Sequence, residues 1–135
     1  MTTKKIEHIN PEGLINNPAF TNVITVPSAT KTIYIGEQNS NNEKGEVVAK
    51  GDFKAQSEQV LKNIGVALKA AGAGFENVIK WTIFAVQGQP LQQGFEAFQK
   101  VWGNRPNPPI VSMCFVSALA NPDYLIGIEA IAVLE

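Results

Sequence analysis

The 135-residue sequence is poor in the side chains that most often carry chemistry, with one histidine, one cysteine and one arginine. With a single cysteine, Cys114, the chain cannot form an internal disulfide. His8 and Cys114 are too few for a zinc-binding cluster and form no Ser-His-Asp or Cys-His arrangement along the chain. We expect His8 to be a surface residue and Cys114 a small buried hydrophobe. The sequence therefore predicts neither a metal site nor a cofactor.

The sequence also lacks an excess of charge of either sign. Eleven basic and twelve acidic residues give a net charge of -1, and Lys4 and Lys5 are the only adjacent basic pair. Binding to nucleic acid depends on many lysine and arginine contacts to phosphate, so we expect no nucleic-acid partner. No segment reaches the roughly 18 apolar residues of a membrane span, and no apolar region follows the N-terminal lysines. These observations predict a cytoplasmic protein without a membrane partner.

The length and the hydrophobic content of 44% are typical of one globular domain, which we place at residues 1–135. Apolar residues recur every three or four positions in two segments, as expected for helices that bury one face. The first helix is expected from Asp52, a good N-terminal cap, to Ala71, just before Gly72. The second is expected from Leu91 to Trp102.

Short runs rich in β-branched residues predict the strands. These runs lie at residues 20–26, 32–36, 78–86, 109–116 and 125–134, with a shorter extended piece at 6–9. The pattern predicts an α+β domain with two helices packed on one face of the sheet. Three of the strands are apolar on both faces, and two helices can cover only one face. The other face therefore needs a partner, and a closed cyclic oligomer of the same chain would supply it.

Several polar or small residues are candidates for a site. Glu129 lies in an apolar strand, where a carboxylate needs either a structural partner or a role in a site. Gly127 points to the same face and leaves room beside Glu129, either for close packing or for a pocket. Arg105 follows Trp102 in a loop stiffened by three prolines and could clamp a carboxylate, although most surface arginines have no such role. Tyr34 lies near a strand end, where clefts often form.

Five motifs, in their order and spacing, resemble the YjgF/RidA family. They are NPEGL at 10–14, IYIG at 33–36, GDFKAQ at 51–56, AAGA at 70–73 and IEAIA at 128–132. Lys80-Trp81 and the WG…PNPP segment at 102–109 resemble one branch of that family. The resemblance implies a chorismate-mutase-like fold and a homotrimer with a central β-barrel, helices outside and ligand clefts between subunits. It also implies hydrolysis of reactive enamines and imines, such as 2-aminoacrylate, to a keto acid and ammonia.

In active members of the family an arginine binds the substrate carboxylate and a glutamate is thought to hold the attacking water. By resemblance, Val111 stands at the arginine position and Gly127 at the position of that glutamate, while a second acid survives as Glu129. Met113 replaces a cysteine and Phe20 replaces a tyrosine. The resemblance thus places the ligand cleft at Phe20, Tyr34, Gly36, Val111, Met113 and Gly127.

These replacements lead to three hypotheses about function. The first is a trimeric small-molecule-binding protein that lacks the usual imine deaminase activity, because the bidentate anchor for a carboxylate is missing. The second is a hydrolase for imines, enamines or related small carbonyl compounds, with Arg105 as a relocated anchor and Glu129 as the acid or base. The third, an endoribonuclease or translation inhibitor, is disfavoured by the absence of a basic stripe.

Overall fold

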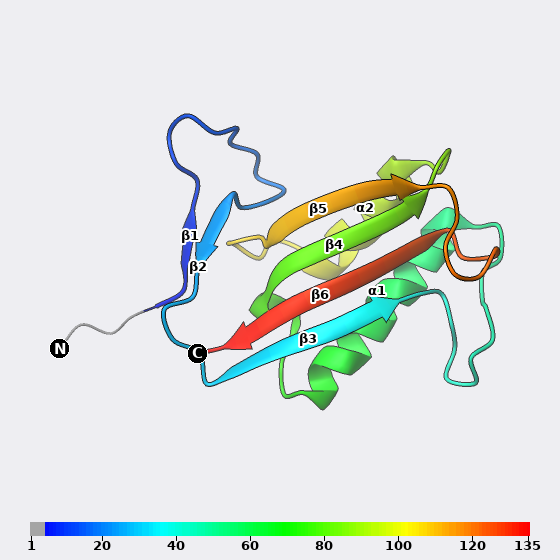
Figure 1. The fold of residues 1–135 in the computed structure, drawn as a ribbon, viewed down its shortest axis with the longest axis horizontal. Helices are drawn as coiled ribbons and strands as arrows, with labels where there is room; N and C mark the ends of the chain where they lie inside the picture. Colours follow the sequence, from blue (N-terminus) through cyan, green and yellow to red (C-terminus); the bar gives the residue numbers. More distant parts are fainter. Residues whose placement is uncertain (1–4) are drawn as a thin grey trace.

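The computed structural model of the chain describes residues 5–135. In chain order the elements are β1 (Glu7–Ile9), β2 (Val23–Thr25), β3 (Lys31–Gln38), α1 (Phe53–Ala70), a 3₁₀ turn (Phe75–Asn77), β4 (Val78–Val86), α2 (Leu91–Trp102), β5 (Ile110–Val116) and β6 (Ile126–Leu134). A four-stranded sheet has the order β3-β6-β4-β5 (Figure 1). Its β4–β5 pair is parallel and the other pairs are antiparallel, so the sheet is mixed.

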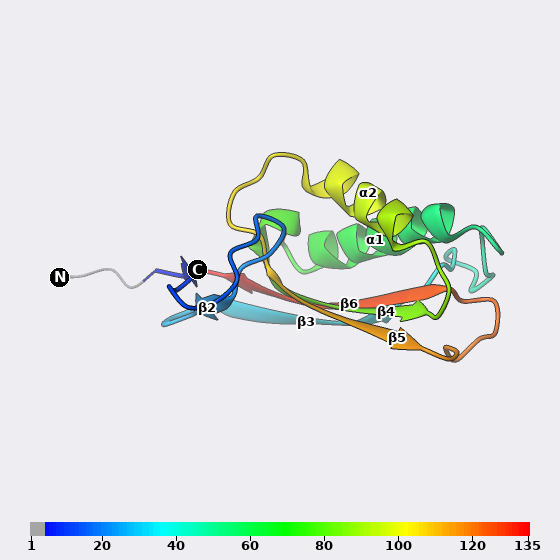
Figure 2. The ribbon, with the colours of Figure 1, turned by 90° about the horizontal axis from the view of Figure 1, so that it is seen from above.

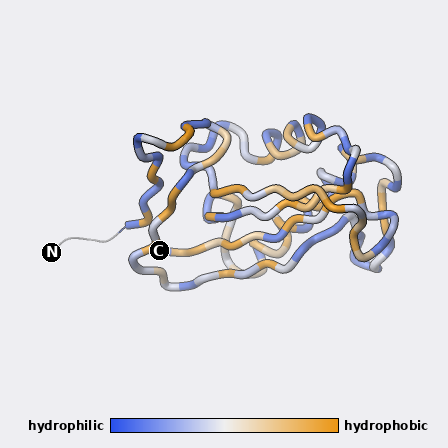
Figure 3. Tube along the Cα trace, turned by 45° about the horizontal axis from the view of Figure 1, so that its top comes forward, coloured by the Kyte–Doolittle hydropathy of each residue, from blue (hydrophilic) through white to orange (hydrophobic). Residues whose placement is uncertain are grey.

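Both helices lie on the same face of this sheet, with α2 packed against α1 (Figure 2). The predicted α+β class and the placement of the helices are therefore confirmed. Orange, apolar stretches interrupted by a few polar positions follow the strands of the main sheet, and orange and blue alternate along the helices (Figure 3). No helix of the described chain covers the opposite face, which we call the open face. In residues 5–135 no helix is both long and apolar enough to cross a membrane.

Helix α1 begins and ends where local signals predict. Asp52 accepts a hydrogen bond from the backbone amide of Ala55 at 3.0 Å, and Gly72 takes a positive φ of 82° just after the helix. The face of α1 toward the sheet buries the core residues Val60, Leu61, Ile64 and Leu68. Hydrophobic burial of this stripe, rather than helix propensity alone, holds α1 on the sheet.

The prediction of a fifth strand at 20–26 in the main sheet is wrong. Only Val23–Thr25 is extended there, and it pairs with β1 in a separate two-stranded sheet. Asn17 prevents a longer strand because its side chain accepts from the amide of Ala19 and its carbonyl accepts from the amide of Phe20. These contacts form a turn, as is common for asparagine. Thr21 then donates to the carbonyls of Pro108 and Pro109, just before β5, and fixes the segment beside that strand.

Strand β4 contains one extra residue relative to its partner β6. Val78 pairs with Ala132 and Lys80 pairs with Ile131, so Ile79 forms a β-bulge. Val78 and Trp81 are consequently both buried beneath the helices, although they are three positions apart. A regular strand would send them to opposite faces.

The prediction that Cys114 is buried is also wrong, because the residue is exposed. Cys114 lies in β5, an edge strand of the sheet. Its neighbours Val111 and Met113 line a cavity on the helix side, and Cys114, one position further along, points to the open face. No described element covers it there. His8, expected at the surface, is half-buried in β1.

Candidate functional site

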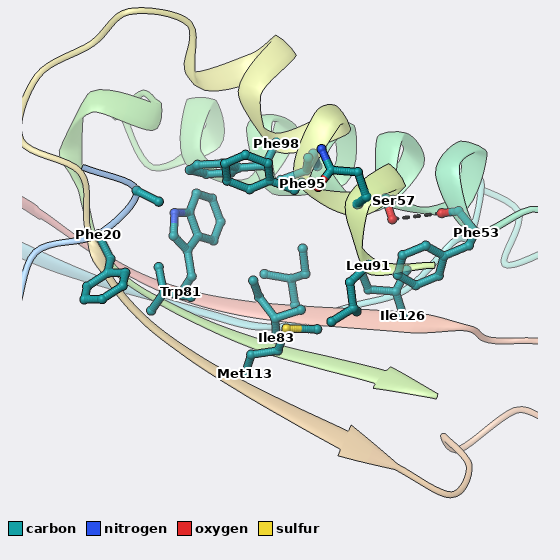
Figure 4. Close-up of a pocket in the computed structure, with 16 residues that line it drawn as sticks. Phe20, Phe53, Ser57, Trp81, Ile83, Leu91, Phe95, Phe98, Met113 and Ile126 are labelled. Carbon is teal, nitrogen blue, oxygen red and sulfur yellow. Dashed lines mark hydrogen bonds between the residues drawn. The ribbon is translucent and has the colours of Figure 1, made fainter. Parts of the chain in front are cut away.

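A cavity of about 310 Å³ lies between the two helices and the sheet, and we call it the apolar cavity (Figure 4). Its wall comes from both helices, three strands of the main sheet and the segment before β2. The lining residues are Ala19, Phe20, Phe53, Ser57, Leu61, Trp81, Ile83, Leu91, Gln92, Gly94, Phe95, Phe98, Val111, Met113, Ile126 and Ile128. Such a concave, mostly apolar volume is typical of a small-molecule site.

The cavity has a buried floor and a more exposed rim. Trp81 and Phe53 on the floor are 1% and 3% exposed. At the rim, Phe95 of α2 is 39% exposed and Met113 of β5 is 41% exposed. The route to solvent therefore lies between α2 and the edge strand β5.

Aromatic side chains hold the ring of Trp81 in place. Phe98 meets it edge to face at a centroid distance of 6.0 Å, and Phe75 is 6.2 Å away on a tilted plane. Phe98 in turn stacks on Trp102, again at 6.0 Å. Edge-to-face and offset contacts at these distances are favourable, so the indole has a fixed orientation.

The wall of the apolar cavity carries very little polarity. None of its described residues is an acid, a base, a cysteine or a tyrosine. The hydroxyl of Ser57 donates to the carbonyl of Phe53 at 2.8 Å. Within residues 5–135, Trp81 Nε1 is the only buried side-chain nitrogen or oxygen without a hydrogen-bond partner. The cavity thus offers one buried unpaired donor, the exposed amide of Gln92 and no charge.

A second, smaller hollow of about 220 Å³ lies on the open face, and we call it the polar hollow. Its lining residues are Tyr34, Ile35, Gly36, Lys80, Thr82, Glu129, Ala130 and Ile131. Thr82 and Glu129 are directly opposite each other in the β4–β6 register. Neither Lys80 nor Glu129 forms an ion pair with another residue of the described chain. The hollow therefore presents both charges to solvent and suits a polar ligand.

The predicted cleft residues fall into separate groups within one protomer. Phe20, Val111 and Met113 line the apolar cavity. Tyr34, Gly36 and Glu129 line the polar hollow on the other side of the sheet. A single protomer does not bring the two groups together.

Gly127 belongs to neither lining set and lies against the end of β3. A Cβ atom at this position would clash with the carboxylate of Glu37 and lie 2.8 Å from Asn39 Nδ2. Asn39 Nδ2 donates to Glu37 Oε2 at 2.8 Å and holds that carboxylate in place. Glu37 thus occupies the space that a side chain at 127 would need, and a larger residue there would have to displace this exposed carboxylate.

Arg105 is engaged at the end of α2. Its Nη1 donates to the carbonyls of Val101 at 2.8 Å and of Trp102 at 3.1 Å, and its guanidinium lies 5.8 Å from the Trp102 ring centre. These contacts satisfy carbonyls that the helix leaves free at its C-terminus. Arg105 lines neither the apolar cavity nor the polar hollow.

Sequence reasoning missed the residues that give each site its chemistry. Trp81 was noted only as part of a family motif, and Lys80 and Thr82 were not considered as site residues. The alternation of side chains along β4 is a usable signal, since it places Lys80 and Thr82 on the opposite face of the sheet from Trp81. Glu37 had no such signal, because an irregularity between Ile35 and Gln38 places it beside Gly127.

Comparison with protein families and curated proteins gives consistent results. The family model described as Endoribonuclease L-PSP matches residues 16–134. A RutC family protein from Pyrococcus horikoshii is 40% identical over 91 residues, which cover 67% of this chain and 69% of the relative. The human 2-iminobutanoate/2-iminopropanoate deaminase is 31% identical over 103 residues, covering 76% of this chain and 73% of the relative.

Solved structures extend the similarity to the whole fold. A protein of unknown function of the conserved Rid family from Yersinia pestis has a TM-score of 0.83 at 30% identity, covering 96% of this chain and 98% of its own. The YjgF gene product of E. coli has a TM-score of 0.70 at 28% identity, covering 82% and 85%. The chain shares their chorismate-mutase-like fold, as predicted.

Proposed function

Because the chain belongs to the YjgF/RidA family, matched by the Endoribonuclease L-PSP model, we propose that it is a small-molecule-binding homotrimer without the usual imine deaminase activity. The observation that carries this proposal is the uncharged wall of the apolar cavity around Phe20, Val111 and Met113. A substrate with a free carboxylate would lose its hydration there and find no counter-charge. We treat residues 1–135 as one domain of this family.

The separation of the predicted cleft residues supports an oligomer, and the trimer order comes from the family resemblance. Val111 and Glu129 lie on opposite sides of one sheet, so they can share a cleft only if two copies meet. Apolar side chains are available for such a contact: Phe115 of β5 is 52% exposed and Tyr34 on the open face is 77% exposed. Burial of these residues between subunits would complete the ligand clefts and remove exposed apolar surface.

Two measurements test this proposal. Sedimentation is expected to give three times the 14.6 kDa of one chain. Ammonia release from 2-aminoacrylate made in situ is expected to stay at the rate without protein, while the human deaminase relative accelerates it. Acceleration by this protein similar to that of the human relative would contradict the proposal.

A hydrolase acting on imines, enamines or a related small carbonyl compound is the second candidate. The polar hollow favours it, because Glu129, Lys80 and Thr82 offer a carboxylate, an ammonium and a hydroxyl side by side. The printed names of the deaminase relatives favour it as well. Arg105 would have to leave its helix carbonyls to act as the anchor. Any turnover should then fall with Arg105→Ala and with Glu129→Gln; turnover unchanged in both variants would exclude this assignment.

The family description also raises endoribonuclease activity, but the net charge of -1 gives little support for binding RNA. We propose that the protein has neither a nucleic-acid nor a membrane partner, and the cytoplasmic location stays a prediction. Salt-dependent RNA binding by the purified protein would contradict this part of the proposal.

A further inference from the structure

We propose that the apolar cavity binds an uncharged, mostly apolar molecule with one hydrogen-bond acceptor, which receives the N–H of Trp81. A carbonyl oxygen on a small ring compound has this chemistry. The inference rests on the proposed small-molecule function and adds the class of ligand. It also names Trp81 as the residue that orients the ligand.

The unpaired indole is the first observation. Trp81 is 1% exposed, and its Nε1 has no partner within residues 5–135. Buried donors in folded proteins nearly always have a partner. The other indole of the chain follows that rule, since Trp102 Nε1 donates to the carbonyl of Arg105 at 2.9 Å. The exception at Trp81 occurs on the wall of a cavity.

The direction of the donor is the second observation. Figure 4 shows the nitrogen of Trp81 on the side of its ring nearer to Phe20, another residue of the cavity wall. Contacts with Phe75 and Phe98 fix the ring. A donor with a fixed direction selects for an acceptor at one place in the ligand, whereas a mobile donor would not.

The rest of the wall defines the ligand class. Without an ionisable lining residue, the cavity has no counter-charge for a carboxylate or an ammonium group. Phe53, Phe95 and Phe98 supply apolar and aromatic surface. The volume of about 310 Å³ is at the lower end of the usual range for small-molecule sites, about 300–1,000 Å³. A one-ring neutral ketone therefore fits the requirements.

Three probes of similar shape test separately whether the ligand needs a hydrogen-bond acceptor and whether it must be uncharged. Acetophenone has a ring and a carbonyl acceptor, α-methylstyrene replaces that oxygen by a CH₂ group, and benzoate carries a charge. The measurement is the pair of indole N–H signals in ¹⁵N-¹H correlation spectra of the intact protein. We expect acetophenone to move the Trp81 signal strongly and the Trp102 signal little, because Trp102 Nε1 already has a partner. Benzoate is expected to move neither.

The variant Trp81→Phe removes the donor and keeps an aromatic ring. We expect the preference for acetophenone over α-methylstyrene, as a ratio of Kd values, to fall about 3- to 10-fold in this variant. Trp102→Phe is the matched control and should keep the wild-type ratio. Spectra of the wild-type protein provide the same test if Trp81→Phe folds poorly.

The outcomes separate this inference from the proposed function. If both neutral probes bind but Trp81→Phe leaves their ratio unchanged, the role of Trp81 is wrong, while small-molecule binding stands. If benzoate binds as tightly as acetophenone, the uncharged ligand class is wrong. If neither neutral probe moves a cavity signal at millimolar concentration, the inference is overturned; the proposed trimer and the deaminase result are then judged by their own measurements.

Discussion

The apolar cavity and the polar hollow lie on opposite faces of the same strands and differ in nearly every chemical respect. Trp81 faces the cavity, while Lys80 and Thr82, its neighbours in the chain, face the hollow. Ile128 and Glu129 are divided in the same way. Strand alternation therefore gives this small domain one uncharged site and one charged site from the same few residues. Neighbouring substitutions should consequently have unrelated effects.

The largest expected contrast is between two adjacent residues. Trp81→Ala empties the floor of the apolar cavity and should lower the free energy of unfolding by about 3–5 kcal/mol. Lys80→Ala removes a side chain with no ion-pair partner in the described chain and should cost less than about 1 kcal/mol. Urea denaturation of both variants measures the difference. Similar losses of unfolding free energy in both variants would mean that the two faces of β4 do not contribute independently to stability.

A charge placed in the apolar cavity should change its ligand preference. Val111→Arg brings a guanidinium to the cavity wall, and we expect benzoate to bind at least about tenfold more tightly than to the wild type. Acetophenone should bind more weakly, because the arginine occupies part of the volume. Val111→Met is the uncharged control of comparable length. Calorimetric titration gives the affinities, and a gain for benzoate in Val111→Met would contradict the electrostatic explanation.

Arg105→Ala should have a moderate effect on stability and none on the apolar cavity. The variant loses hydrogen bonds to the carbonyls of Val101 and Trp102, and we expect a loss of about 0.5–1.5 kcal/mol. Arg105→Lys should recover part of it. Denaturation and acetophenone titration together test this role. Unchanged stability combined with lost turnover would instead support Arg105 as a substrate anchor.

Glu129→Gln should leave the apolar cavity of its own protomer unaffected, because within one protomer the carboxylate lies on the other face of the sheet. We expect the Kd for acetophenone to stay within about twofold of the wild-type value, which corresponds to less than about 0.5 kcal/mol. Titration under the same conditions as for the wild type is the measurement. A larger change would show that Glu129 of a neighbouring copy acts on the cavity across the subunit contact.

The smallest expected effect is the dependence of stability on pH through His8. Burial lowers the pKa of His8 from its ordinary value of 6.5, so the folded protein binds this proton less readily than the unfolded chain. The contribution of neutral His8 is fully present above pH 6.5 and declines as the pH falls through 6.5 toward the lower folded pKa. His8→Gln should lack this decline, and the difference in unfolding free energy between the two proteins should change with pH. Acetophenone affinity should stay constant in the same range, since no lining residue of the cavity ionises there.

The helices could be predicted because their signals are local. Asp52 and Gly72 mark the ends of α1, and the apolar spacing between them marks its buried face. The strand at 20–26 was predicted too long because the hydrogen bonds of Asn17 form a turn that ends at Phe20, just before the β-branched residues. The same propensity cannot say whether a short strand joins the main sheet or a separate one.

The arrangement of the candidate site could not be read from the sequence in the same way. Val111 and Gly127 were assigned to one cleft by resemblance, but their faces depend on how each strand is paired. The position of Glu37 beside Gly127 depends on the irregularity in β3. The N–H of Trp81 is unpaired because the surrounding elements place no hydrogen-bond acceptor beside it. Both features belong to tertiary structure.

The β-bulge at Ile79 determines which side chains of β4 face the helices and which face the open side of the sheet. Val78 and Trp81 are separated by an odd number of positions, and the extra residue allows both to be buried. Deletion of Ile79 would leave Val78 and Trp81 two positions apart, so a regular strand would still place both on the buried face. Lys80 would then lie between Val78 and Trp81 in the chain and would stay on the open face. The bulge therefore lets β4 lose one residue at this point without exchanging its two faces.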